Sequence, residues 1–145
     1  MTVRKMTTDD IPEVAQIEKQ CFHQPWSAEE ILRTYQSVTS LFTVAEEGRK
    51  VVGYVGMYLV PDEGYIINVA VSPLFRKKGV ATQLIAQILE DAKEEGVQNV
   101  SLEVRKSNQE AIRLYEKIGF ESVGIRKNFY ELPPEDAIIM WKYGI

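Results

Sequence analysis

The segment Tyr65–Ala92, YIINVAVSPLFRKKGVATQLIAQILEDA, joins two apolar stretches through a turn that holds three consecutive cations and a glycine. Its first part, Tyr65–Val71, is a short apolar run and predicts a buried strand. Gly96 predicts the end of the helix that follows the turn. Apolar residues at helical spacing predict the buried face of that helix: Val80, Leu84, Ile85, Ile88, Leu89 and Ala92.

A further strand follows, because Asn99–Val104, NVSLEV, is a short run typical of strands. The stretch from Ile66 to Val104 is therefore a strand–helix–strand unit. Such a connection is right-handed and places its two strands side by side in parallel. We expect these two strands to be neighbours in a sheet.

The part of the chain before this unit predicts one strand and two helices. Thr2–Met6 is short and alternating, as expected for a strand. Asp9–Phe22 has apolar residues at helical spacing, with Pro12 in the first turn, where a missing amide is tolerated. Ser27 and Glu30 form a capping box that predicts the start of the second helix.

A hairpin and a helix flank the central unit. Leu41–Glu47 and Lys50–Val60 predict two paired strands around a turn at Glu47–Arg49. Ser107–Phe120 predicts a helix that Ser107 or Asn108 caps and Gly119 ends.

Two final strands, around Glu121–Lys127 and Asp136–Tyr143, flank a predicted turn at Glu131–Glu135. The predicted order is thus βααβββαβαββ, an α/β fold with a mixed sheet. No repeat, linker or low-complexity segment interrupts the 145 residues, so we expect one domain, 1–145.

The composition indicates the kind of compartment in which the protein works. Hydrophobic residues make up 45% of the chain and charged residues 26%, values typical of globular domains. A single cysteine, Cys21, excludes an internal disulfide. The N-terminal residues form no apolar signal segment, and no run approaches the length of a membrane span. We expect a cytoplasmic protein without membrane contact.

The formal net charge of −4 argues against a surface built for nucleic acid. An anionic partner would therefore have to bind a local patch of positive charge. The candidate for this patch is Arg76-Lys77-Lys78. A strand, a basic glycine turn and a helix N-terminus together favour phosphate binding, because the first helical amides are unpaired. The alternative is a charged loop that caps a helix, with Gly79 serving only its conformation.

Other chemistries find no support in the sequence. The chain contains neither GxxxxGK[ST] nor GxGxxG. His23 is the only histidine and Cys21 the only cysteine, which argues against a zinc site and against a Ser/His/Asp triad. We expect no metal.

The run VAVSPLFRKKGVA resembles the acetyl-coenzyme A signature of the GNAT superfamily of N-acetyltransferases, with Arg76, Gly79 and Ala81 at its three defining positions. Leu102–Phe120, LEVRKSNQEAIRLYEKIGF, resembles the second half of that family's pattern. The resemblance covers nearly the whole chain. It implies the GNAT fold, whose two central parallel strands splay apart, and acetyl-CoA as co-substrate.

Three further stretches are similar to the RimI-type group of ribosomal-protein-alanine N-acetyltransferases: Ile17–Ser27 (IEKQCFHQPWS), Leu102–Asn108 (LEVRKSN) and Glu135–Met140 (EDAIIM). This similarity implies acetyl transfer to the N-terminal alanine of small-subunit ribosomal protein eighteen, in a ternary complex. The sequence leaves the oligomeric state open, and we expect a monomer. Ala81 replaces a commoner glycine, and Phe129 stands where tyrosine is frequent. A small-molecule amine or a lysine side chain stays open as acceptor, and so does a non-catalytic CoA-binding module.

The resemblance also implies roles for particular residues. Glu103 would be the general base, acting through water, and Tyr115 the acid that protonates the departing thiolate. Without the resemblance, Glu103 is an exposed strand residue and Tyr115 is core packing. Asn108 would both cap its helix and bond the pantetheine arm. Residues implied to bind the coenzyme are Val69, Ala70, Val71, Arg76, Lys77, Lys78, Gly79, Val80, Ala81, Thr82 and Asn108.

The acceptor side is expected to lie between Trp26, with the second helix, and the turn Phe129–Glu135. Trp26 could instead simply pin the two helices together. Glu135 and Asp136 would suit a basic ribosomal protein by charge.

Overall fold

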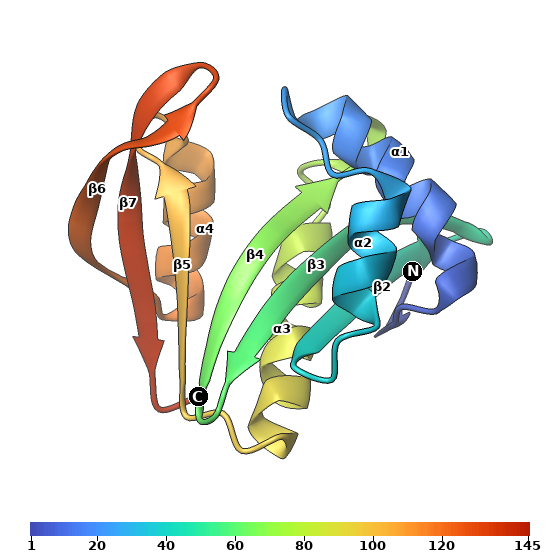
Figure 1. The fold of residues 1–145 in the computed structure, drawn as a ribbon, viewed down its shortest axis with the longest axis horizontal. Helices are drawn as coiled ribbons and strands as arrows, with labels where there is room; N and C mark the ends of the chain where they lie inside the picture. The colour runs from blue at the N-terminus through green and yellow to red at the C-terminus, as the bar shows by residue number, and fades with distance from the viewer.

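The structure, a computed structural model, describes residues 1–145. Its strands form one seven-stranded sheet in the order β1-β2-β3-β4-β5-β7-β6 (Figure 1). The predicted order of elements is confirmed. The elements are β1 (Thr2–Lys5), α1 (Ile11–Cys21), α2 (Ala28–Tyr35), β2 (Ser40–Glu47), β3 (Lys50–Val60), β4 (Glu63–Val71), α3 (Val80–Glu94), β5 (Asn99–Arg105), α4 (Gln109–Ile118), β6 (Glu121–Glu131) and β7 (Pro134–Tyr143).

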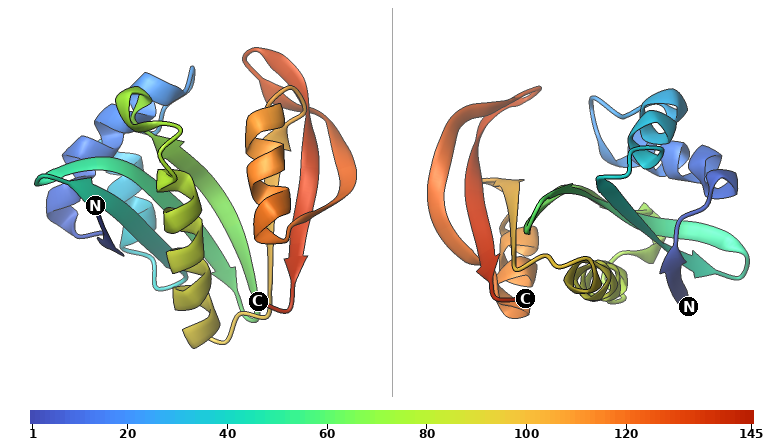
Figure 2. Two further views of the ribbon diagram at one scale, coloured as in Figure 1. Left: turned by 180° about the vertical axis from the view of Figure 1, so that it is seen from behind. Right: turned by 60° about the horizontal axis from the view of Figure 1, so that its bottom comes forward.

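Helices cover both faces of the sheet. α1 and α2 lie on one face, against β2, β3 and β4, while α3 and α4 lie on the other (Figure 2). None of the helices is long and apolar enough to span a bilayer.

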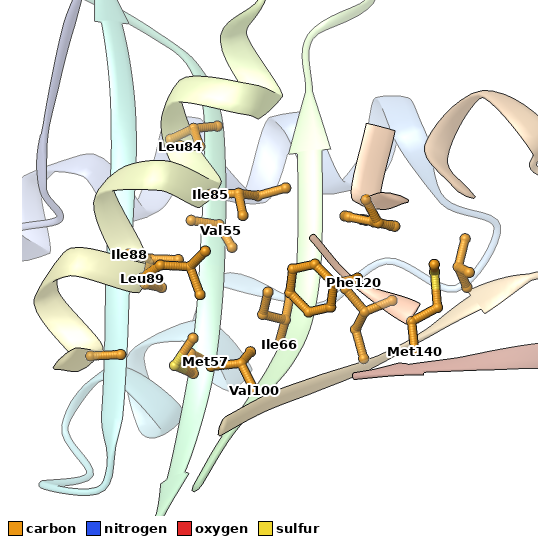
Figure 3. Packing of buried hydrophobic residues seen from close by; sticks show 14 of the residues in the cluster. Val55, Met57, Ile66, Leu84, Ile85, Ile88, Leu89, Val100, Phe120 and Met140 are labelled. Atoms are coloured by element: carbon orange, nitrogen blue, oxygen red, sulfur yellow. The ribbon is translucent and has the colours of Figure 1, made fainter. Parts of the chain in front are cut away.

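Two clusters of buried side chains hold these layers together. The larger has 18 buried residues and packs the apolar face of α3 onto the sheet (Figure 3). Leu84, Ile85 and Ile88, all predicted to face inward, are completely buried there. The smaller cluster has 11 buried residues beneath α1 and α2. Burial of this apolar surface is the main stabilising contribution to the fold.

The predicted helix ends are confirmed. The Ser27 side chain accepts a hydrogen bond from the Glu30 amide at 3.2 Å, and the Asn108 side chain accepts one from the Ala111 amide at 3.2 Å. Gly119 follows α4 with a φ of +114°, a conformation that favours glycine.

The last hairpin differs from prediction. β6 runs to Glu131 and β7 begins at Pro134, so the connection is only Leu132–Pro133 rather than Glu131–Glu135. Pro134 pairs with Glu131 as the first residue of its strand, a position where a missing amide is tolerated.

β4 and β5 are parallel, as predicted, but only at one end. Their pairing consists of Glu63 with Asn99, Gly64 with Val100, and Tyr65 with Ser101. Beyond Tyr65 the strands separate, as Figure 1 shows, although each continues for several residues. The expected splay of the two central strands is therefore present.

A bulge accompanies this divergence. On β4, Asn68 faces Gly56 and Ile66 faces Met57, which leaves Ile67 as an extra residue. Bulges bend and twist a strand locally. This one lies where β4 leaves β5.

Candidate active site

A cleft of about 780 Å³ opens between the diverging strands. Its sides come from β4, β5, the loop before α3, the first turns of α4, the end of α1 and the tip of the β6–β7 hairpin. All the residues predicted to be catalytic or to bind the coenzyme line it, except Lys78 and Thr82. The fold thus brings together residues from both halves of the sheet.

The loop before α3 presents unpaired backbone amides. None of the amides from Arg76 to Thr82 donates a hydrogen bond within the protein, and the first in the helix is Gln83 to the Gly79 oxygen at 3.1 Å. Lys77 and Gly79 have φ values of +62° and +79°. Free amides at a helix N-terminus, beside left-handed residues, form a site that favours anions.

The three cations of this loop take different positions. Arg76 folds back onto the protein, where Nε donates to the Val71 oxygen at 3.1 Å and a terminal nitrogen lies 3.2 Å from Cys21 Sγ. Lys77 lines the cleft. Lys78 does not, and its Nζ lies 5.4 Å from the centre of the Phe75 ring. Lys78 therefore lies outside the cleft lining, and its contact with the coenzyme stays a prediction.

Thr82 is the other predicted residue outside the cleft lining. Its side chain is exposed and lies outside the cleft, because it points from the first turn of α3 toward solvent. Only its unpaired amide belongs with those of Lys77 to Ala81.

The β4 residues Val69, Ala70 and Val71 line the cleft at the part of the strand that has no β5 partner. The Val71 oxygen accepts hydrogen bonds from Arg76 and, at 3.5 Å, from Cys21 Sγ. The edge left open by the splay thus lies along the cleft wall.

Glu103 lies on β5 beyond the last β4–β5 pair and lines the cleft. Its side chain is only 7% exposed, so the reading of an ordinary exposed strand residue is wrong. The Tyr65 hydroxyl donates a hydrogen bond to Glu103 Oε1, and Arg126 Nε lies 3.9 Å from Oε2. The carboxylate is therefore held at the cleft by its surroundings.

Tyr115 combines packing with access to the cleft. Its ring is buried and makes an edge contact with Phe120 at 5.8 Å between centroids. The hydroxyl has no hydrogen-bond partner within the protein, yet it is not sealed from solvent, and the residue lines the cleft. Burial raises the pKa of the Tyr115 phenol, so it remains a proton donor at neutral pH.

Glu18 is a cleft residue that the sequence analysis missed. It is 1% exposed and accepts hydrogen bonds from the Trp26 amide (2.9 Å), the Tyr54 hydroxyl (2.6 Å) and the Asn68 side chain (3.3 Å). Burial raises the pKa of Glu18. One feature of the sequence could have indicated that Glu18 is buried. It stands four residues after Val14, on the apolar face of α1.

The opposite wall is the β6–β7 hairpin. Arg105 donates to the oxygens of Leu132 (3.0 Å) and Pro133 (2.9 Å) and pairs with Glu135 at 3.2 Å. Its guanidinium also lies 4.2 Å from the centre of the Tyr130 ring. One side chain thereby fixes the tip of the hairpin to the end of β5.

The acidic residues expected to attract a basic substrate are already engaged. Glu135 accepts from the Ser107 amide at 2.6 Å in addition to its pairing with Arg105. Asp136 accepts from the Asn128 amide at 2.9 Å. Both carboxylates therefore hold the hairpin in place.

The pattern of the acetyltransferase (GNAT) family matches residues 11–120, and the chain belongs to this family. Within this family, the chain is 33% identical over 141 residues to the ribosomal protein bS18-alanine N-acetyltransferase of Escherichia coli K12. The alignment covers 96% of this chain and 95% of the relative. A Bacillus subtilis protein whose name assigns the same activity provisionally is 36% identical over 140 residues, with coverages of 96% and 93%.

A solved structure agrees with these sequences. The crystal structure of the ribosomal-protein-S18-alanine N-acetyltransferase from Escherichia coli superimposes with a TM-score of 0.90 at 32% identity. The match covers 98% of this chain and 92% of that chain.

Proposed function

We propose that the chain is an acetyl-CoA-dependent N-terminal acetyltransferase that acetylates the N-terminal alanine of ribosomal protein bS18. One observation carries the proposal: a single cleft is lined by the unpaired amides before α3 and by Glu103 and Tyr115. The names of the relatives support the choice of acceptor. We further propose that the enzyme works in the cytoplasm as a monomer, without direct contact with nucleic acid or membrane.

The coenzyme side of this proposal rests on the loop and on β4. The amides of Lys77 to Thr82 would hold the pyrophosphate, and Lys77 would add positive charge. The open edge of β4 at Val69 and Val71 would pair with the pantetheine arm, with Asn108 on the opposite side. Acetyl-CoA supplies the acetyl group as a thioester.

The chemical step is divided between two residues. Glu103 takes a proton from the incoming amine through a water molecule, and Tyr115 gives a proton to the departing thiolate. A backbone amide of β4 at the splay stabilises the oxygen that becomes negatively charged. No covalent intermediate with the protein is needed, because amine and thioester meet in one cleft.

An α-amine suits this arrangement better than a lysine. Its pKa is about 7.7–8.0, compared with about 10.4 for a lysine side chain, so a larger fraction is neutral at physiological pH. A base of modest strength is then sufficient.

The test is acetyl transfer from acetyl-CoA to two synthetic peptides. One begins with the N-terminal alanine of bS18, and the other has a blocked N-terminus and an internal lysine. We expect thiol release with the first peptide only. Modification of the second would overturn the acceptor, while bound coenzyme without transfer to either would favour a small-molecule acceptor or a non-catalytic module.

A further inference from the structure

Tyr65 occupies the apex of the cleft. It is the last residue of β4 that pairs with β5, opposite Ser101. Glu103 lies two residues beyond Ser101, and residues two apart in a strand share a face of the sheet. Tyr65 and Glu103 are therefore diagonal neighbours across the point where the strands part, within reach of a long aromatic side chain.

This placement brings their polar atoms together. The Tyr65 hydroxyl donates a hydrogen bond to Glu103 Oε1, and no other group in the protein hydrogen-bonds the Glu103 side chain. Arg126 also faces Glu103, but at 3.9 Å and with a side chain that is 60% exposed. Tyr130 on β6 lies near enough to interact electrostatically with both Tyr65 and Glu103.

The direction of the hydrogen bond is fixed by the protonation of the phenol. Burial, followed by the contact with Glu103, raises the pKa of Tyr65, so the phenol keeps its proton at neutral pH. An ionised carboxylate only accepts hydrogen bonds. Tyr65 is therefore the donor, and Oε2 of Glu103 is left without a hydrogen bond from the protein.

We propose that Tyr65 is the positioning residue for Glu103, because its hydroxyl holds one carboxylate oxygen so that the other faces the acceptor amine. This inference rests on the proposed role of Glu103 as the base. In this arrangement the carboxylate is already oriented before the substrates bind.

The test is Tyr65→Phe, which keeps the ring and removes the hydroxyl. We expect kcat with the alanine peptide to fall about tenfold, a fraction of the effect of a complete general base. The KM for acetyl-CoA stays unchanged. The matched control is Tyr58→Phe. Tyr58 lies on β3, directly opposite Tyr65 of β4, and its hydroxyl makes no hydrogen bond.

A double-mutant cycle separates this inference from the function on which it rests. If Tyr65 acts through Glu103, adding Tyr65→Phe to Glu103→Gln lowers kcat no further. Equal losses in both backgrounds, or wild-type kcat in Tyr65→Phe, would overturn the positioning role while leaving Glu103 as base. Full turnover by Glu103→Gln alone would instead overturn the base itself and the inference with it.

Discussion

At the scale of single residues, Glu18 shows how a buried charge organises one wall of the cleft. Its three hydrogen-bond donors come from different segments: Trp26 from the α1–α2 connection, Tyr54 from β3 and Asn68 from β4. A buried carboxylate is costly unless such partners satisfy it. The network therefore ties the α1–α2 connection to β3 and β4 at one wall of the cleft.

The raised pKa of Glu18 predicts a specific dependence of stability on pH. Between the ordinary glutamate pKa of about 4.3 and the higher folded value, the folded protein retains a proton that the unfolded chain releases. This stabilising contribution is complete below the unfolded pKa and is lost as pH rises through the folded pKa. Compared with Glu18→Gln, the wild type should therefore lose stability as pH rises above the ordinary glutamate pKa and through the folded pKa of Glu18.

Urea unfolding of both proteins across this pH range measures the difference in free energy. Glu30→Gln is the control, because the hydrogen bond from the Ser27 amide lowers the pKa of Glu30, so the contribution of Glu30 changes only below the ordinary glutamate pKa and stays constant above it. A difference between wild type and Glu18→Gln that does not change with pH would contradict the prediction.

The sequence predicts site residues unevenly, for a physical reason. Glu103 and Tyr115 stand in motifs whose spacing is visible along the chain. Glu18 and Tyr65 matter through partners far away in sequence, at Tyr54 and Glu103, and such contacts depend on strand register. From the sequence, Tyr65 is predicted only to begin a strand. Its place beside Glu103 follows from its pairing with Ser101, which the sequence does not give.

At the scale of elements, the loop before α3 carries the coenzyme prediction. Gly79→Asp places a carboxylate beside the unpaired amides, so acetyl-CoA affinity should fall at least tenfold, about 1.4 kcal/mol. Gly96→Asp is the matched control. Both glycines have positive φ, +79° and +88°, and an added Cβ meets no atom within 4 Å at either one.

Isothermal titration with acetyl-CoA measures both variants, and thermal unfolding shows whether each is folded. Because the backbone strain is similar at the two positions, a loss of affinity specific to Gly79→Asp reports on the loop. Wild-type affinity in that variant would contradict phosphate binding at the α3 N-terminus.

Element order was predictable because local chemistry marks helix ends strongly. Ser27 and Asn108 cap their helices through hydrogen bonds, and Gly119 ends α4 with positive φ. The β6–β7 hairpin was predicted too short because Pro133 and Pro134 are typical of turns. Pairing between Glu131 and Pro134, supported by Arg105 contacts to the loop, extends the strands past that signal.

At the scale of the whole molecule, the sheet is one structure that opens along part of its length. Only three residue pairs join β4 to β5, whereas β5 pairs with β7 along all of its length. The two halves share one buried cluster, which includes Val55 and Leu84 on one side and Leu102 and Met140 on the other. The sequence predicts from the crossover that β4 and β5 are parallel neighbours. The residue at which their pairing ends depends on how each half of the sheet packs, and the sequence does not predict that residue.

A ligand that bridges this opening should stabilise the whole fold. Acetyl-CoA bound to the folded protein alone contributes about 2.7 kcal/mol at a concentration of one hundred times its Kd. For a chain of 145 residues this corresponds to a rise in Tm of roughly 5–10 °C. The contacts proposed for the coenzyme lie on both sides of the cleft, from Val69 on β4 to Asn108 at α4, so a single transition should move as a unit.

Differential scanning calorimetry with increasing acetyl-CoA provides the measurement, and Gly79→Asp should show at most about half of the wild-type rise in Tm over the same concentrations. Adenosine 3′,5′-bisphosphate, which lacks the pantetheine arm and the pyrophosphate, should raise Tm far less at equal concentration. If it stabilised the wild type as much as acetyl-CoA, the arm would contribute nothing, and the open edge of β4 would not be its binding site. A much larger rise with acetyl-CoA than with the bisphosphate is the outcome expected when the pantetheine arm occupies the edge of β4 that β5 leaves unpaired.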